Sequence, residues 1–414
     1  MSVLKDTDGI EQQYTEHPYP APISNMQERI EQGYRQGSSP DQLWHKLFPE
    51  KAYRDDLNIL IAGCGTNQAV YHALRFPNSH HYAIDVSDAS LNHVKDMIKK
   101  YDIKNLEIEK KDIVELQHKN EFDYVISTGV IHHTKDPQES LSRLVETTKD
   151  DGALCIMVYA SYLRVGIYYF QDVFRYLGLK PTKKDIGTAK KLIELSPKNH
   201  YAHNYIEAIT RSSGTKDLSF DAGFVDTFFN ARDVAFDIFE LKELINNAGA
   251  YLQCWIDNSQ FYRYLINFSR AESLNETYNN FDPWELGDFI QKMSPSAGKF
   301  DFVLRKEKKY EHRYFYITDV LPSTYAHRYR LTDREKPDIS SNKGGSIGNV
   351  NVEVKLDIIE RIAWDNLNNK IEDVLNMSND LFSKHGIDKE LSFEELRGML
   401  HRFWKNGYLS FSDK

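Results

Sequence analysis

Two glycines and an acid form the part of the sequence that is best suited to holding a ligand. Gly63 and Gly65 follow an apolar run at 57–62, and Asp85 ends a second apolar run at 81–85. Gly63 allows a tight turn after a strand, and Gly65 lets the backbone come within contact distance of a ligand. A carboxylate at a strand end can accept hydrogen bonds from ribose hydroxyls. The spacing therefore predicts a nucleotide or nucleoside site in a Rossmann-like unit.

The glycine turn departs from the dinucleotide-binding pattern at its third position. Gln68 stands where the fingerprint G-x-G-x-x-G has its last glycine, so the turn does not suit a pyrophosphate. The neighbouring Asn67 tolerates left-handed backbone angles better than most residue types. Taken alone, the turn also fits an α/β connection that binds no ligand.

Two further polar segments follow the third and fourth expected strands. Asp112 follows the third strand, and the pair His132 and His133 follows the fourth. With the glycine turn and Asp85, these features resemble class I S-adenosylmethionine-dependent methyltransferases over about residues 57–160. The resemblance implies S-adenosylmethionine as the cofactor and S-adenosylhomocysteine as the product. It also implies methyl transfer by in-line displacement to a positioned acceptor.

The same resemblance implies three sets of site residues. The residues expected to bind the cofactor are Gly63, Gly65, Asn67, Gln68, Asp85, Val86, Asp112, Ile113, Thr128 and Gly129. The catalytic candidates are His132, His133 and Tyr159, and the candidates for contacting the acceptor are Tyr14, Tyr19 and Tyr168. A base is needed only if the acceptor arrives protonated, and paired histidines also occur in methyltransferases whose base lies elsewhere. No metal site is expected, because Cys64, Cys155 and Cys254 lack ligand spacing and are interpreted as small buried residues.

Alternating apolar runs and helical patterns predict an α/β fold with a Rossmann-like, seven-stranded and mostly parallel sheet. The expected strands are 57–62, 81–85, near 106–108, 122–127, 153–159, 251–257 and 299–305. A helix is expected from Asp237 to Gly249, with Asp237 and Glu240 as a capping box and Gly249 as the stop. This arrangement closes the methyltransferase domain, expected at 51–306.

Four additions surround the expected core. Residues 1–50 should form an N-terminal strap, and its segment from Tyr14 to Pro22 is too rich in proline for regular helix. This strap is either a lid over the cofactor cleft or a packing element on the domain surface. Insertions at about 160–236 and 258–298 are aromatic and could supply an acceptor pocket or simply form their own cores.

The C-terminal part is expected to be a separate unit. A polar linker at 307–350 precedes a small α+β domain at 351–414 that resembles a winged-helix module. Its basic face is modest, so a role in dimerisation, substrate recognition or protein contact is favoured over DNA binding.

Composition narrows the class of protein further. The formal net charge of −9 over 414 residues disfavours sequence-independent binding to nucleic acid, which needs many cations. No apolar run approaches transmembrane length, and Met1 to Asp6 has no apolar signal core. These features favour a cytoplasmic protein that binds neither nucleic acid nor membrane, and a homodimer is compatible with them.

Three functions remain compatible with these patterns. The leading hypothesis is a methyltransferase with a small-molecule acceptor, because the aromatic insertions could enclose one. The second is a protein or peptide methyltransferase whose C-terminal domain docks the polypeptide. The third is a non-catalytic regulatory protein that binds the cofactor. The acceptor atom, whether oxygen, nitrogen, sulfur or carbon, is left open.

Overall fold

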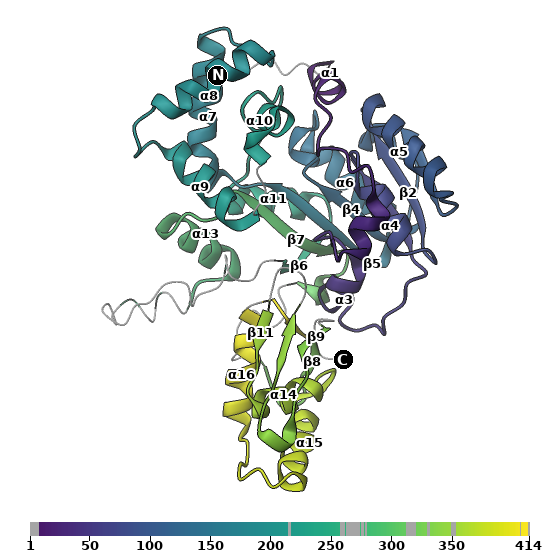
Figure 1. Ribbon diagram of the computed structural model, residues 1–414, viewed down its shortest axis with the longest axis vertical. Coiled ribbons are helices and arrows are strands. Elements are labelled where there is room, and N and C mark those ends of the chain that lie inside the picture. The colour runs from purple at the N-terminus through teal and green to yellow at the C-terminus, as the bar shows by residue number, and fades with distance from the viewer. Residues whose placement is uncertain are drawn as a thin grey trace.

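A seven-stranded sheet forms the centre of the protein in the computed structural model (Figure 1). The structure describes residues 8–213, 217–256, 261, 274, 277, 280–311, 320–328, 332–348, 353–405 and 407–412. The strands run in the order β3-β2-β1-β4-β5-β7-β6. They are β1 (Asn58–Ala62), β2 (His80–Asp85), β3 (Leu106–Lys110), β4 (Phe122–Thr128), β5 (Thr148–Tyr159), β6 (Tyr251–Trp255) and β7 (Lys299–Arg305). The first five strands pair in parallel, and β7 is antiparallel to both of its neighbours.

Alternation along each strand sends side chains to two separate cores. In β1, Ile59 and Ile61 pack on one face of the sheet, while Leu60 and Ala62 pack on the other. The first face is covered by α3 (Pro40–Leu47), α4 (Gln68–Arg75) and α5 (Asp88–Tyr101). The second is covered by α6 (Pro137–Thr147), α11 (Ile238–Asn247) and α13 (Pro283–Met293). Both faces are therefore buried, as a parallel sheet requires.

The predicted Rossmann-like fold, with a seven-stranded and mostly parallel sheet, is confirmed. The expected capping box of α11 is present, with Asp237 Oδ1 accepting from the Glu240 amide at 2.8 Å and Glu240 Oε2 accepting from the Asp237 amide at 2.8 Å. Gly249 ends the helix with a φ of +73°, in the left-handed region that glycine tolerates. Local sequence signals therefore fixed both ends of this helix.

The first insertion folds into helices with a core of their own. They are α7 (Ser161–Tyr176), α8 (Lys183–Leu195), α9 (Tyr201–Ser213) and α10 (Asp221–Phe228). Phe170, Phe174 and Phe228 lie in a cluster separate from the two sheet cores. Most of the insertion's aromatic residues therefore stabilise the insertion itself. In the second insertion, the described residues form α13, and much of 258–279 lies outside the described part of the chain.

The N-terminal strap differs in one respect from the expectation. Helix α1 (Asp8–Glu16) includes Tyr14, so the stretch from Tyr14 to Glu16 is helical rather than irregular. The prolines restrict only the residues next to them, and the first is Pro18. The chain is irregular from Pro18 to Asn25 apart from bends, and it then forms α2 (Met26–Glu31). Figure 1 shows this purple segment running across the sheet near α4 and α5.

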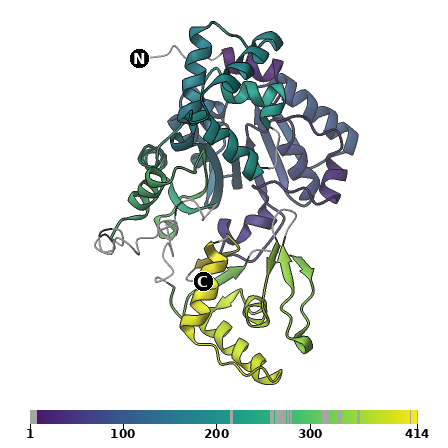
Figure 2. The ribbon, with the colours of Figure 1, turned by 60° about the vertical axis from the view of Figure 1, so that its left-hand side comes forward.

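Two small sheets and three helices make up the C-terminal part, which lies below the large sheet in both views (Figures 1 and 2). One sheet joins β8 (Tyr325–Arg328), β12 (Asn369–Lys370) and β13 (Leu409–Ser412), and the other joins β9 (Thr332–Glu335), β10 (Ser346–Gly348) and β11 (Glu353–Lys355). The helices are α14 (Ile358–Asp365), α15 (Ile371–Lys384) and α16 (Phe393–Lys405). The stretch expected to be a linker thus contains β8, β9 and β10, because its polar residues pair as short strands rather than crossing solvent.

Helix α3 links the C-terminal part to the large sheet by hydrogen bonds. His45 Nε2 donates to the carbonyl of Gly407 at 3.2 Å, and Ser410 Oγ donates to the carbonyl of His45. Lys46 Nζ donates to the carbonyls of Trp255 and Ile256 at 3.1 and 2.6 Å. One short helix therefore contacts both the large sheet and β13.

Candidate functional site

A large pocket opens at the carboxyl ends of β1, β2, β4 and β5. Its volume of about 1380 Å³ exceeds the roughly 300–1,000 Å³ of an ordinary small-molecule site. The order of strands reverses between β1 and β4, and such a switch point is where open α/β sheets bind ligands. The pocket lining includes all ten residues expected to bind the cofactor, namely Gly63, Gly65, Asn67, Gln68, Asp85, Val86, Asp112, Ile113, Thr128 and Gly129.

The glycine turn after β1 has the backbone conformation that only glycine adopts easily. Gly63 and Gly65 have φ values of +74° and +52°. A Cβ atom on Gly63 would lie 2.3 Å from Cγ2 of Val130, so this glycine lets the turn pack against the loop after β4. A Cβ atom on Gly65 would lie 3.3 Å from Cδ of Pro20. The turn is therefore closely covered on both sides.

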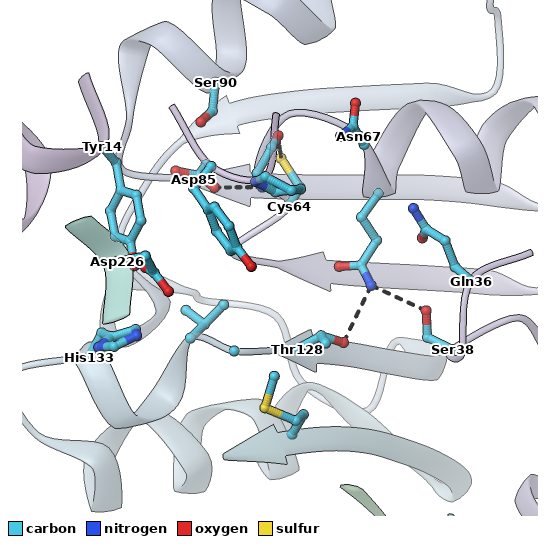
Figure 3. Close-up of a pocket in the computed structure, with 18 of the residues that line it drawn as sticks. Tyr14, Gln36, Ser38, Cys64, Asn67, Asp85, Ser90, Thr128, His133 and Asp226 are labelled. Carbon is cyan, nitrogen blue, oxygen red and sulfur yellow. Dashed lines mark hydrogen bonds between the residues drawn. The ribbon is translucent and has the colours of Figure 1, made fainter. Parts of the chain in front are cut away.

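Asp85 links the end of β2 to that turn (Figure 3). Its Oδ2 accepts from the amide of Gly65 at 2.8 Å, and its Oδ1 accepts from the amide of Ser87 at 2.9 Å. Burial raises the pKa of Asp85, and these backbone hydrogen bonds oppose the rise. Each carboxylate oxygen keeps acceptor capacity for a ligand hydroxyl. The residue is thus both a structural link and an available acceptor.

Residues 66–67 fasten the N-terminal strap to the glycine turn. Thr66 Oγ1 donates to the carbonyl of Pro20 at 2.6 Å. Asn67 donates from Nδ2 to the carbonyl of Ala21 at 2.9 Å and accepts at Oδ1 from the amide of Ile23 at 2.9 Å. Asn67 has a φ of −120° and precedes α4. Its backbone therefore does not adopt the left-handed conformation that the sequence interpretation considered. Its side chain binds the strap instead.

Gln68 connects the two sides of the pocket. Its Nε2 donates to Ser38 Oγ at 3.2 Å and to Thr128 Oγ1 at 3.3 Å (Figure 3). Asp112 caps the short helix Ile113–Glu115, because its Oδ1 accepts from the amide of Val114 at 3.2 Å. Asp112 is also part of the pocket lining.

The two histidines after β4 have different surroundings. His133 lines the pocket, and its Nδ1 lies 2.5 Å from the carbonyl of Arg232, so Nδ1 carries the proton in the neutral ring. The Nε2 of that tautomer has a free lone pair. His132 is fully buried, and neither of its ring nitrogens has a hydrogen-bond partner in the part of the chain that the structure describes. Burial lowers the pKa of His132, and His132 is not part of the pocket lining.

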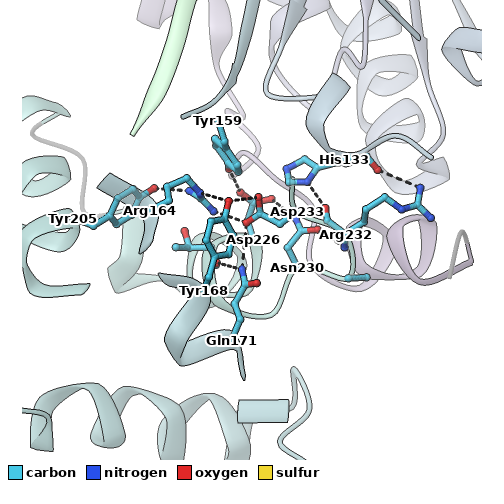
Figure 4. Close-up of polar contacts among 12 residues, drawn as sticks. His133, Tyr159, Arg164, Tyr168, Gln171, Tyr205, Asp226, Asn230, Arg232 and Asp233 are labelled. Atoms are coloured by element: carbon cyan, nitrogen blue, oxygen red, sulfur yellow. Dashed lines mark hydrogen bonds and ion pairs between the residues drawn. The ribbon is translucent and has the colours of Figure 1, made fainter. Parts of the chain in front are cut away.

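A polar cluster closes the end of the pocket near His133. Asp226 accepts at Oδ1 from Tyr14 Oη at 2.7 Å and at Oδ2 from Tyr159 Oη at 3.2 Å. Asn230 Nδ2 donates to Asp226 Oδ1 at 3.4 Å (Figure 4). Tyr14, Tyr159, Asp226 and His133 all line the pocket, so α1, β5, α10 and the loop after β4 converge there.

A buried ion pair between Arg164 and Asp233 lies next to this cluster. Arg164 Nη2 lies 2.5 Å from Asp233 Oδ2, and both side chains are almost fully buried. The guanidinium also lies 3.6 Å from the ring centre of Tyr159 and so supports that ring from behind. Tyr168 Oη donates to Asp233 Oδ1 at 3.2 Å, and Tyr168 is not part of the pocket lining. Of the three tyrosines expected to contact an acceptor, Tyr14 and Tyr19 line the pocket.

Asp226 and Ser38 are pocket residues that the sequence interpretation did not single out. Asp226 lies in an apolar helical stretch of the first insertion, and no local pattern separates it from a capping or surface acid. Ser38 precedes α3 in a polar stretch of ordinary composition. Both reach the pocket through long-range contacts, so no motif around either could have identified them.

Comparison with known proteins finds similarity over part of the chain. Residues 54–181 match the model of a family described as a methyltransferase domain. An uncharacterised protein of Synechococcus sp. is 22% identical over 254 residues, which is 59% of each chain. Malonyl-[acyl-carrier protein] O-methyltransferase of Acetivibrio thermocellus is 29% identical over 104 residues, 25% of this chain and 36% of that protein. The matches thus span between about a third and three fifths of these relatives.

Solved structures resemble the fold over more of the chain. The structure of PKMT2 from Rickettsia typhi superposes with a TM-score of 0.63 at 13% identity, covering 91% of this chain and 76% of that one. A second structure of that protein, in complex with AdoHcy, gives a TM-score of 0.63 at 14% identity, with 91% and 75% covered. At these identities the likeness concerns the fold. In the described segments, no helix is both long and apolar enough to cross a membrane.

Proposed function

We propose that the protein, whose residues 54–181 form a class I S-adenosylmethionine-dependent methyltransferase domain, methylates a small-molecule acceptor held beside His133 and Tyr159. The observation that carries this proposal is that one large pocket joins the glycine turn and Asp85 to the polar cluster around Asp226. Its volume leaves room for a cofactor and an acceptor together.

The residues of the pocket fit S-adenosylmethionine. The cofactor contributes a methyl group on a sulfonium sulfur that is already activated for displacement. Asp85 offers acceptor positions for two ribose hydroxyls, and Val86 and Ile113 offer apolar surface for adenine. Gly63 and Gly65 line the pocket beside Asp85, so the backbone of the turn is placed to contact the methionine portion. No phosphate-binding glycine follows Gly65, which agrees with a cofactor that lacks phosphate.

The work left to the protein is to orient the acceptor and to accept its proton. His133 is placed to accept one at Nε2, because Nδ1 is held by the carbonyl of Arg232. Tyr14 covers the cluster from α1, so the strap excludes water from this end of the pocket. Tyr159 is held by Arg164 on one side and by Asp226 through its hydroxyl. Each of these groups acts by positioning or by holding a proton.

Small-molecule acceptors are favoured because insertion helices and the strap surround the acceptor end. Tyr14 comes from α1, Asp226 from α10 and Tyr205 from α9, and all three line the pocket. Two relatives carry names consistent with this: a probable (S)-tetrahydroprotoberberine N-methyltransferase of Papaver bracteatum and an (S)-tetrahydroprotoberberine N-methyltransferase of Eschscholzia californica. A polypeptide acceptor that docks on the C-terminal part is the alternative.

Calorimetry followed by an acceptor screen tests this function. S-adenosylhomocysteine should bind, and NAD should show no comparable affinity. Methyl-labelled cofactor should then transfer label to members of a metabolite library. A preference for NAD would contradict the methyltransferase assignment. Label found only in polypeptides, and lost on removal of residues 351–414, would support the polypeptide alternative instead.

A further inference from the structure

Asp226 is a buried carboxylate inside the pocket that lacks a cationic partner. It is 5% exposed and receives hydrogen bonds from two phenols and one amide, all of them neutral donors. In the part of the chain that the structure describes, no Lys, Arg or His forms an ion pair with it. Burying a carboxylate with neutral donors alone is costly, and a positive charge beside it would offset that cost.

The neighbouring arginines are engaged elsewhere. Arg164 forms its ion pair with Asp233 at 2.5 Å. Arg232 also lines the pocket, but its Nη1 donates to the main-chain carbonyl of His133 at 3.4 Å. In the view of Figure 4, Asp226 and the guanidinium of Arg232 lie on either side of His133. Among the described residues, neither arginine therefore forms an ion pair with Asp226, although Arg232 keeps Nε and Nη2 without a hydrogen-bond partner.

Aromatic rings surround the same position. The ring centres of Tyr14 and His133 are 6.4 Å apart, and those of His133 and Tyr159 are 5.4 Å apart. Burial and the charge of Asp226 raise the pKa values of Tyr14 and Tyr159 well above their ordinary range, so both phenols stay neutral. A buried carboxylate that accepts from two neutral phenols is suited to an ammonium group, which would gain an ion pair and charge-assisted hydrogen bonds.

We propose that the methyl acceptor is an amine, which binds as its ammonium form to Asp226 between Tyr14, Tyr159 and His133. This assignment rests on the proposed function and names its substrate class. Before transfer, the ammonium releases a proton to Asp226 or to Nε2 of His133, which frees the nitrogen lone pair. A nitrogen–carbon bond then forms as the sulfur–carbon bond breaks, and the bonding electrons remain on the sulfur. The product is the N-methylated amine with S-adenosylhomocysteine.

A screen sorted by functional group tests the proposal on the full-length protein. The library contains amines, with matched alcohols, thiols and carboxylic acids, such as benzylamine beside benzyl alcohol and phenylacetate. Polylysine and a lysine-containing peptide are included, because the side chain of lysine offers the same amine chemistry as a free small molecule. The labelled acceptors should be amines. Comparing the small amines with polylysine and the lysine-containing peptide then decides whether the amine is free or belongs to a polypeptide.

Variants separate a role in acceptor binding from one in folding. Asp226→Asn keeps the size of the side chain and an oxygen for Tyr14 while removing the charge. It should lower kcat/KM for the best amine by roughly 100-fold, as loss of a base or charged partner does, and leave the affinity for S-adenosylhomocysteine within about twofold. Asp221→Asn is the matched control, since Asp221 starts the same helix but pairs with Lys190 outside the pocket. If Asp226→Asn unfolds, Tyr14→Phe tests the same cluster more mildly.

The possible results separate a failure of the amine assignment from a failure of the proposed methyltransferase function. Label on carboxylic acids or alcohols in preference to amines, with dependence on Arg232 rather than Asp226, overturns the amine assignment and leaves methyl transfer intact. Full activity of Asp226→Asn on an amine also overturns it. Failure to bind S-adenosylhomocysteine, with no label on any acceptor, overturns both. Amine labelling that depends on Asp226 supports both.

Discussion

The hydroxyl of Thr66 donates to the main-chain carbonyl of Pro20 at 2.6 Å and so ties the N-terminal strap directly to the glycine turn. This contact places the strap beside the glycine turn, while Tyr14 reaches the other end of the pocket and donates to Asp226. Strap and pocket are therefore one structural unit. The sequence predicted the strap either as a lid or as a packing element. These two roles predict different effects of removing it.

Removing residues 1–22 should abolish most turnover and change stability little, if the strap acts as a lid. Most described side chains of residues 11–22 are exposed or only partly buried, and the first fully buried apolar one of the strap is Met26, which the deletion retains. Turnover per folded molecule and the Tm of the cofactor-free protein are the two measurements. A packing element would give the reverse, with a large fall in Tm and nearly full turnover. The comparison is with the intact protein.

Replacing Asp85 should weaken cofactor binding by at least about tenfold. Hydrogen bonds to an ionised acceptor contribute roughly 1.5–3 kcal/mol each, and about 1.4 kcal/mol corresponds to a tenfold change in Kd. Asp85→Ala also removes the acceptor for the Gly65 and Ser87 amides, so Asp85→Asn is measured beside it. Titration calorimetry with S-adenosylhomocysteine gives the affinities. The control is Asp88→Asn, an exposed acid three residues away that lies outside the pocket lining. Unchanged affinity in both Asp85 variants would make this residue a strand-end cap only.

His45 should make the protein less stable as pH falls below 6.5. Burial, with a smaller contribution from Lys46, lowers the pKa of folded His45 to about 3, whereas the unfolded residue titrates near 6.5. Between these values the unfolded chain binds more protons, so the free energy of unfolding rises with pH in this window. At pH 5 the penalty relative to pH 7 is about 2 kcal/mol.

Denaturant unfolding at pH 5 and pH 7 measures this contribution. His45→Gln cannot titrate yet keeps a donor for the Gly407 carbonyl, so its stability should depend less on pH than that of the unaltered protein. His385→Gln, at an exposed position of the C-terminal part, should leave the pH dependence as it was. An equal pH dependence in all three proteins would contradict the assignment to His45. The neighbouring charged and titratable groups, Lys46 and His327, are unchanged throughout.

The sequence determined the sheet and the cofactor edge because their signals are local. Apolar runs set the strands, the Asp237–Glu240 capping box and Gly249 set a helix, and Gly63 with Gly65 set the turn. Each of these depends on residues only a few positions apart, where spacing translates directly into geometry. The expected strands therefore agree with the observed ones within a few residues, β5 excepted at its start.

Only the tertiary structure decided what lies at the acceptor end of the pocket. Tyr14 and Asp226 are separated by 212 positions, and their contact depends on how the strap and the first insertion pack on the sheet. His132 and His133 are adjacent in sequence, yet one faces the pocket and the other a closed interior. The short strands β9 and β10 pair with each other, and β10 also pairs with β11, but their polar sequence carries no apolar alternation and so predicts a loop. Packing between distant segments sets burial and charge surroundings, and no local pattern encodes these.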